Sequence, residues 1–139
     1  MVPEFRELSI REKGLLEKLL NAANQGRDEL RAQMTTLTAK QIIEDGTLDL
    51  RCQSGPSAPG KDAFVAEGIC KDADGADIAV ILHLGKGGFM SMLEIIRYDG
   101  SRIINPPSAE NLVLNWVPKF EVLGPGKYRQ VPDPATNHE

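Results

Sequence analysis

Apolar residues near the start of the chain recur at helical spacing. Ser9 and Glu12 have the S-x-x-E spacing of a capping box, which marks the start of a helix. Gly26 is placed to end it. The residues between them that fall three and four apart lie on one helical face: Leu15, Leu16, Leu19, Leu20 and Ala23. This pattern predicts a helix from about residue 10 to residue 24.

A second helix is expected from about residue 28 to residue 38. Asp28 is a residue type that caps helices. Leu30, Met34 and Leu37 follow at spacings of four and three. The stretch from residue 39 to residue 44 fits either an extension of this helix or an irregular strand, and the pattern does not choose between them.

Beyond residue 46 the hydrophobic period changes from helical to two, as in half-buried strands. The expected strands span residues 47–53, 64–71, 76–84, 89–98 and 112–117. Asp72 to Gly75 forms the turn of the clearest hairpin. The stretch 54–60 reads as a loop because it is rich in glycine and proline.

These elements predict an α+β fold with two N-terminal helices packed on an antiparallel meander sheet of four to five strands. In the strand 89–98, Met90, Met92 and Ile96 share one face by strict alternation. Residues 1–123 are expected to form a single domain, and residues 124–139 a loop or flexible tail.

The composition argues against some classes of function. The 139 residues carry a net charge of -4, which opposes binding to nucleic acid phosphates and accommodates a basic protein partner. The chain lacks both a secretory apolar core and the roughly 20 apolar residues of a membrane span. A cytoplasmic protein without membrane contact is therefore expected.

Cysteine usage gives no sign of a metal site. Cys52 and Cys70 fall in predicted strands, where free thiols behave as small buried hydrophobes. A disulfide between adjacent strands stays open, although reducing compartments disfavour it. The sequence has no CxxC pair and no other zinc spacing, so neither a metal nor a cofactor is predicted.

Two turns contain residues found in ligand-binding loops. Asp72, Asp74 and Asp77 could supply oxygen ligands, but their spacing does not fit an EF-hand, and a hairpin turn is favoured. The glycine-rich turn 85–88 precedes a strand, whereas phosphate-binding loops precede a helix. Both are therefore interpreted as hairpin turns.

His83 is the only histidine within the predicted fold, and an exposed or structurally hydrogen-bonded role is favoured for it over acid–base chemistry. At most one of Ser91 and Glu94 can share its face of the sheet, since they alternate on the next strand. Glu94 and Asp99 are more simply solvated or ion-paired carboxylates. No catalytic residue is assigned.

Aromatic residues concentrate near the C-terminus, where large amphipathic rings can act as binding anchors. Core packing is the favoured role of Trp116. The candidate partner-binding residues are Trp116, Phe120, Tyr128, Glu94 and Asp99. If the chain instead has a pocket between helices and sheet, its candidates are His83, Met90 and Met92.

Three segments resemble a family of small uncharacterised bacterial proteins. They are Arg6 to Glu12 with the leucines that follow, the turn Lys71 to Gly75, and the strand Leu93 to Asp99. The resemblance extends over residues 6 to 104; Ile96 stands where an aromatic residue is usual. It implies a helix-then-sheet layout and no established activity. Small acidic α+β proteins of this kind are also similar to bacterial immunity proteins, which cover a toxin's active site.

The leading hypothesis is a non-enzymatic protein-binding domain of the cytoplasm, in one form an immunity-type toxin inhibitor. The alternative is a small-molecule-binding domain or an unrecognised enzyme. A homo-oligomer formed through an exposed sheet edge or face is a third reading.

Overall fold

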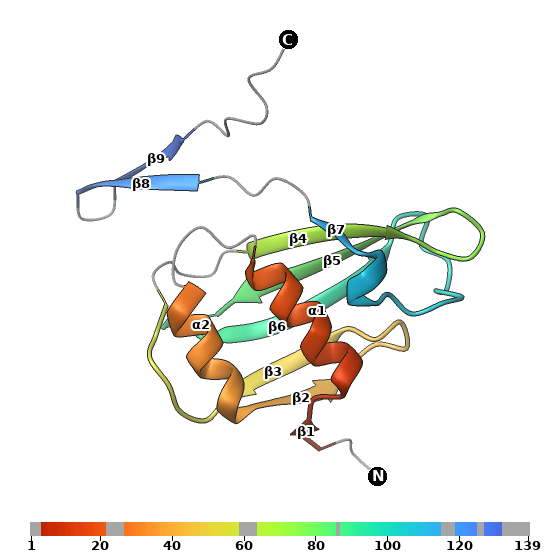
Figure 1. Ribbon diagram of the computed structural model, residues 1–139, viewed down its shortest axis with the longest axis horizontal. Helices are drawn as coiled ribbons and strands as arrows, with labels where there is room; N and C mark the ends of the chain where they lie inside the picture. Colours follow the sequence, from red (N-terminus) through yellow and green to blue (C-terminus); the bar gives the residue numbers. More distant parts are fainter. Residues whose placement is uncertain are drawn as a thin grey trace.

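In the computed structural model, two helices cover one face of a seven-stranded antiparallel sheet (Figure 1). The described residues are 4–21, 27–58, 64–85, 87–114, 119–124 and 127–131. The helices are α1 (Ile10–Leu20) and α2 (Arg27–Gln33), and a 3-10 turn, η1 (Met34–Thr36), follows α2. The predicted α+β class and antiparallel sheet are confirmed.

The sheet has more strands than predicted. Its order is β1-β2-β3-β6-β5-β4-β7. The bounds are β1 (Arg6–Glu7), β2 (Leu37–Gln41), β3 (Leu48–Cys52), β4 (Phe64–Lys71), β5 (Asp77–Leu84), β6 (Met90–Arg97) and β7 (Val113–Leu114). The expected four to five strands are too few because β1 has only two residues, too short to show a period, and β2 lies where a helix and an undecided stretch were expected. β1 also precedes both helices.

The sheet is a meander only from β4 to β6. Strand β3 pairs with β6, so the β2–β3 hairpin joins the far side of the meander. Thr47 extends this pairing, because its buried hydroxyl donates to the Ile95 carbonyl (3.1 Å) and accepts from the Ile95 N–H (2.9 Å). The β2–β3 hairpin is thereby joined to β6 through a side chain as well as through backbone.

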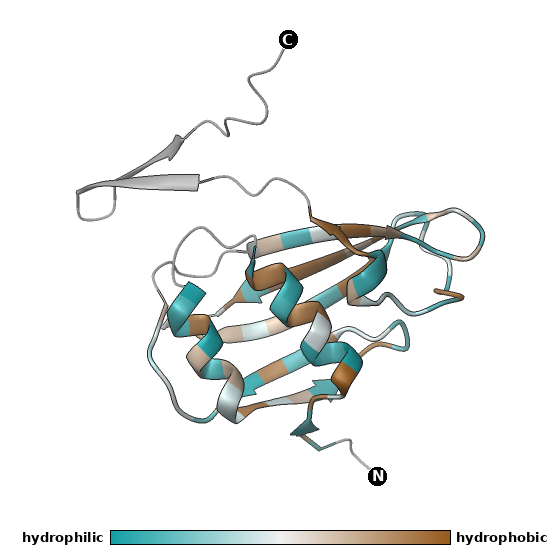
Figure 2. Cartoon of the chain, in the orientation of Figure 1, coloured by the Kyte–Doolittle hydropathy of each residue, from teal (hydrophilic) through white to brown (hydrophobic). Residues whose placement is uncertain are grey.

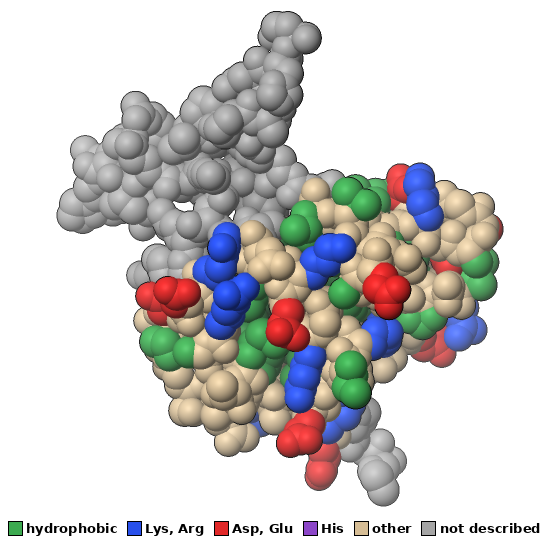
Figure 3. Space-filling model, viewed as in Figure 1, with side chains coloured by type: hydrophobic (Ala, Val, Ile, Leu, Met, Phe, Trp, Pro, Cys, Tyr) green, Lys and Arg blue, Asp and Glu red, His purple; other side chains and the backbone are tan. Residues whose placement is uncertain are grey.

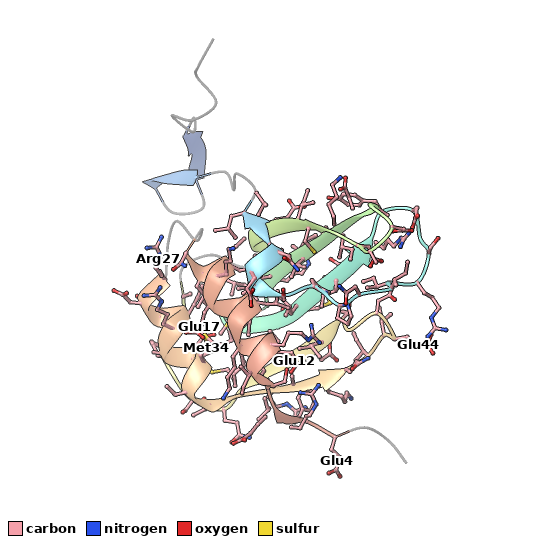
Figure 4. The ribbon with its side chains drawn as sticks, turned by 45° about the vertical axis from the view of Figure 1, so that its right-hand side comes forward. Glu4, Glu12, Glu17, Arg27, Met34 and Glu44 are labelled. Atoms are coloured by element: carbon pink, nitrogen blue, oxygen red, sulfur yellow. The ribbon has the colours of Figure 1, made fainter. Side chains whose placement is uncertain are left out.

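The predicted start of α1 is confirmed by a complete capping box. The Ser9 hydroxyl accepts from the Glu12 N–H at 3.1 Å, and the Glu12 carboxylate accepts from the Ser9 N–H at 2.8 Å. Glu12, labelled in Figure 4, also receives two hydrogen bonds from Arg6, at 2.8 and 3.0 Å. The bonds from Arg6 lower the pKa of Glu12, against the opposing effect of burial. The Arg6–Glu12 ion pair holds β1 against the first turn of α1.

The ends of both helices differ from the prediction. Helix α1 ends at Leu20, and residues 22–26 lie outside the described part of the chain. Helix α2 begins at Arg27, so Asp28 lies in its first turn and is not its cap. The predicted helix through residue 38 is wrong, because β2 begins at Leu37. The threonines near Leu37 disfavour a helix, because β-branched side chains have fewer allowed rotamers in a helix.

The core lies between the helices and the sheet. The largest contributors are fully buried: Leu15, Leu16, Leu19, Leu20 and Leu30 from the helices, and Leu48, Ile78, Val80, Leu82 and Leu93 from the sheet. Figure 2 shows hydrophobic segments on α1 and on the strands behind it. Burying each such side chain stabilises the fold by roughly 1.5–3 kcal/mol.

A β-bulge changes one predicted face of β6. The β5–β6 register shifts between His83 and Leu84, where Met90 pairs with Leu84. Met90 is consequently buried in the core, whereas Met92 lies on the opposite face beside His83. The prediction that Met90 and Met92 share a face is wrong because strict alternation does not anticipate a bulge.

Two more strands follow the main sheet. β8 (Lys119–Gly124) and β9 (Lys127–Val131) pair as a separate antiparallel hairpin. β9 falls within the segment 124–139, for which the sequence predicts a loop or flexible tail. Residues 132–139 lie outside the described part of the chain.

Gln33 joins three segments at the end of α2. Its fully buried side chain donates to the carbonyls of Pro56 and Gly88, both at 2.9 Å, and accepts from the Met90 N–H at 3.0 Å. Gly88 allows this close arrangement, because a Cβ there would lie 2.1 Å from the Ala58 carbonyl oxygen. One side chain therefore fixes the 53–58 loop and the β5–β6 turn to the helix.

Replacing Gln33 with leucine is expected to destabilise the protein. Gln33→Leu keeps the volume but leaves the Met90 N–H without this partner, whereas the Gly88 carbonyl still accepts from the Ala58 N–H. Loss of a buried hydrogen-bond partner costs about 1–3 kcal/mol, and we expect urea unfolding to show a loss of this size. The exposed Gln53→Leu is the control, with an expected change within about 0.5 kcal/mol. Equal effects of the two substitutions would contradict this role.

Candidate binding surface

The face of the sheet away from the helices carries a row of apolar side chains. Successive residues of a strand point to opposite faces, so the neighbours of core residues point outward here. The cross-strand register places four of them side by side across β6, β5, β4 and β7: Ile96, Ala79, Ile69 and Val113. We call these four residues the apolar row. Ile96 is 38% and Val113 69% exposed, so both ends of the row are open to solvent.

A row of acidic residues borders the apolar row on one side. Glu94 lies opposite Ile81, and Ile81 lies opposite Glu67. We call these three residues the acidic row. The Lys71–Asp77 ion pair, whose side chains are 2.5 Å apart, borders the apolar row on its other side. The backbone of Tyr98 lies beside this pair, and its hydroxyl lies 3.5 Å from a carboxylate oxygen of Glu67, so the Tyr98 side chain reaches across the row to the acidic row. Together these rows form the open face, an apolar strip between two charged borders.

His83 is hydrogen-bonded to Glu94 on the open face. Its Nε2 lies 2.8 Å from a carboxylate oxygen of Glu94, and both side chains are 28% exposed. Ser91 instead donates to the backbone carbonyl of His83 at 3.3 Å. The expectation that only one of these two residues reaches the imidazole is therefore confirmed, and Ser91 is not placed as a nucleophile.

Arg97 is the centre of a second charged cluster, on the inner face at the end of β6. Its guanidinium is 6% exposed and bonds to Asp72 (2.8 Å), Asp74 (2.5 Å) and Asp99 (2.9 Å). We call these four residues the Arg97 cluster. It links the β4–β5 turn to the end of β6, so the three carboxylates serve the fold.

Asp72 is the most constrained member of the Arg97 cluster. Burial alone would raise its pKa, but N–H groups of Ile104, Ala73 and Asn105 and the guanidinium of Arg97 all donate to it. These bonds outweigh burial and lower its pKa to about 2. Asp72 thereby also holds the 98–108 segment against the β4–β5 turn.

The pKa values of the two other carboxylates of the cluster are also lowered. The hydrogen bonds from Arg97 and from the Ser101 N–H lower the pKa of Asp99 to about 2. Arg97 and the Ala76 N–H lower the pKa of Asp74. Asp99, a candidate partner-binding residue by sequence, is therefore engaged within the fold.

The structure does not bring together the three residues expected to line a pocket between helices and sheet. Met90 is in the core, whereas His83 and Met92 lie on the open face. Of the aromatic candidates, Phe120 and Tyr128 fall in β8 and β9, and Trp116 lies outside the described residues. Of the candidate partner-binding residues, Glu94 lies on the open face.

Both cysteines are free, and their strands are not neighbours. Cys52 is in β3 and Cys70 in β4, with β6 and β5 between them. This arrangement removes the adjacent-strand disulfide. Burial, followed by the charge of Asp72, raises the pKa of Cys70. Among the described residues, no three His, Cys, Asp or Glu side chains group to hold a metal ion.

No helix in the described ranges is long and apolar enough to span a bilayer.

Comparison with known proteins places the chain in a family. The model of the family described as "Domain of unknown function (DUF6984)" matches residues 5–107. The chain belongs to this family. The match contains both helices and β1 to β6, and β7 to β9 follow it. No curated protein and no solved structure matches this chain. The expected resemblance to an uncharacterised family is confirmed.

The segments that carry the sequence resemblance hold the fold together. Arg6 and Glu12 join β1 to α1. The segments Lys71 to Gly75 and Leu93 to Asp99 meet in the Arg97 cluster. The inward-facing side chains of these segments are thus structural, whereas Glu94, Ile96 and Tyr98 of the same strand segment lie on the open face.

The sequence analysis missed most of the open face. Ile69, Glu67, Tyr98 and Val113 were not candidates, because each looks ordinary within its own strand. The available signal was the alternation of β5, whose second face carries Ala79 and Ile81 between Asp77 and His83, while the sequence offers helices for only one face of the sheet. Their alignment across four strands depends on a register that the sequence does not reveal.

Substitution of Asp72 tests the structural role of the Arg97 cluster. The folded-state pKa values of Asp72 and Asp99, about 2, lie below the unfolded value of about 3.9. The cluster therefore stabilises the fold fully above about pH 4, and this contribution is lost as the pH falls toward 2. Asp72→Asn should lower the urea midpoint at pH 7 and reduce its fall between pH 4 and pH 2.

The matched control is Asp28→Asn, on the exposed surface of α2. It should leave both the midpoint and its pH dependence close to those of the unaltered chain. A pH profile unchanged by Asp72→Asn would show that the cluster does not contribute as described.

Proposed function

We propose that this chain is a protein-binding domain and that the open face is its binding surface. The observation that carries the proposal is the grouping of exposed apolar side chains. Ile96, Tyr98 and Val113 are 38%, 57% and 69% exposed and lie on the sheet face that neither helix covers. An exposed apolar strip rimmed by polar residues is typical of protein interfaces.

The opposite face has a different character. Over α1 and α2, basic and acidic side chains are interspersed (Figure 3). Such a mixed charged surface is typical of solvated helices, whose apolar side is already buried in the core. The contrast between the two faces supports placing the interface on the open face.

The engagement of the acidic groups also supports a binding role. Glu12 is bonded to Arg6, and Asp72 is bonded to Arg97 and three backbone N–H groups. A carboxylate held in its charged form by several donors is poorly suited to exchange protons near neutral pH. An immunity-type toxin inhibitor is one form that this protein-binding domain can take, and the net charge of -4 suits a basic toxin surface.

Affinity capture with matched variants tests this proposal. The tagged full chain, mixed with host lysate or with the product of a neighbouring toxin gene, should retain a defined protein. The double substitution Ile96→Ser, Val113→Ser should reduce capture at least about tenfold, because it removes apolar contact area at both ends of the row.

Ile10→Ser is the control, since Ile10 is 91% exposed at the start of α1 and not on the open face. It should leave capture unchanged. Equal capture by the open-face variant, or loss of capture by the Ile10 variant, would overturn the proposal.

A further inference from the structure

We infer that Phe5, Lys40 and Arg51, on the same side of the sheet as the open face, bind a carboxylate of the partner protein, from an aspartate or glutamate side chain. We call these three residues the basic corner. This inference rests on the proposed protein-binding function and adds one chemical requirement to the partner. Three features lead to it: the place of the corner on the sheet, the stacking of its guanidinium, and the lack of an acceptor for its charges.

The basic corner lies on the sheet face that neither helix covers. Lys40 lies opposite Asp49, and Asp49 lies opposite Met92. Met92 in turn lies opposite His83, which is on the open face. Residues directly opposite one another in an antiparallel pair share a face. Arg51 shares this face as well, because it follows Asp49 by two positions in β3.

One partner can contact the basic corner and the apolar row together. Lys40 and Ile96 are separated by two strand spacings across the sheet and by the four residues between Met92 and Ile96 along β6, which gives about 17 Å. An interface of standard size covers about 800 Å² of each partner and so extends about 30 Å. The basic corner therefore falls within the reach of a protein seated on the open face.

The guanidinium of Arg51 is stacked on an aromatic ring. Its central carbon lies 4.0 Å from the centroid of the Phe5 ring, and the Lys40 amine lies 5.3 Å from the same centroid. Both distances are within the range of cation–π attraction. Stacking orients the guanidinium plane and leaves the N–H donors at its edge accessible. Two parallel N–H donors match the two oxygens of a carboxylate.

The charges of the basic corner have no acceptor among the described residues. There, the Arg51 guanidinium and the Lys40 amine form neither an ion pair nor a hydrogen bond, although Asp49 faces Lys40. Five other arginines each bind an oxygen of the fold: Arg6, Arg11, Arg31, Arg97 and Arg102. Two cations at one ring repel each other, and a shared anion relieves that repulsion. The donors of Arg51 are thus oriented and available to a ligand.

The surroundings of the basic corner favour one carboxylate over a phosphate. Asp49 lies opposite Lys40, and Glu7 is two positions beyond Phe5. These charges and the net charge of -4 repel a dianionic phosphate, a nucleic acid or an anionic membrane more strongly than a single carboxylate. One acidic side chain is also compatible with a partner whose surface is basic overall.

Titration with acetate tests the basic corner in the full chain. Acetate is added at constant ionic strength, and the Nε–H signal of each arginine is followed by NMR. We expect the Arg51 signal to reach half of its shift at an acetate concentration at least about fivefold lower than the Arg102 signal. Arg102 is the internal control, because its side chain is 82% exposed and its ion pair with Glu44 is long, at 3.5 Å.

Phe5→Leu separates the effect of stacking from that of charge. It removes the ring and keeps both cations, so the Arg51 signal should then respond at about the same acetate concentration as Arg102. An unchanged response of Arg51 in this variant would contradict the role of the stacked ring. Inorganic phosphate at the same ionic strength is the second probe and should bind more weakly than acetate.

Charge variants extend the test to the protein captured by the full chain. The double substitution Lys40→Gln, Arg51→Gln should reduce capture about three- to tenfold, the range expected for two exposed ion pairs. The matched control is Lys13→Gln, Arg102→Gln, which removes the same charge from exposed positions outside the basic corner. It should leave capture close to that of the unaltered chain.

The other outcomes each overturn the inference. Equal acetate midpoints at Arg51 and Arg102, or tighter binding of phosphate than of acetate, would exclude a carboxylate site. Equal loss of capture by the two double substitutions would show non-specific attraction. Capture that depends on Ile96 and Val113 but not on the basic corner would remove this inference and leave the proposed function standing. Capture that depends on neither would contradict both.

Discussion

Both helices of this domain pack on the same face of its sheet, and the rest of the structure depends on that one-sided cover. Their leucines meet Leu48, Ile78, Val80, Leu82 and Leu93 to form the core. A sheet of this size has two faces, and among the described residues neither helix reaches the second. The alternation of each strand therefore separates residues that stabilise the fold from residues available to a partner.

Buried polar interactions hold the strands in the register that produces this separation. Thr47 and Gln33 are buried, and they connect β3, β6 and α2 through hydrogen bonds that backbone pairing does not supply. The Arg97 cluster closes the end of β6 against the β4–β5 turn. Because these residues fix the register of β4, β5 and β6, they also align the apolar row, although none of them belongs to it.

Local patterns in the sequence predicted the parts of the fold that depend on local physics. The capping box at Ser9 and the hairpin around Asp72 to Gly75 both formed as expected. The bulge that buries Met90 and the pairing of β3 with β6 were not predictable, because both arise from contacts between distant segments. The open face was missed for the same reason: Val113 and Ile96 are 17 positions apart in sequence and become parts of one row only through the sheet.

Thiol labelling of the free chain tests the central claim of an uncovered sheet face most directly. Ile95 and Ile96 are adjacent in β6, but Ile95 is 4% exposed in the core and Ile96 is 38% exposed on the open face. The thiol introduced by Ile96→Cys should react with a maleimide at least roughly tenfold faster than that introduced by Ile95→Cys, which needs local opening. Equally slow reaction at both positions would show that the face is already covered and would contradict the account.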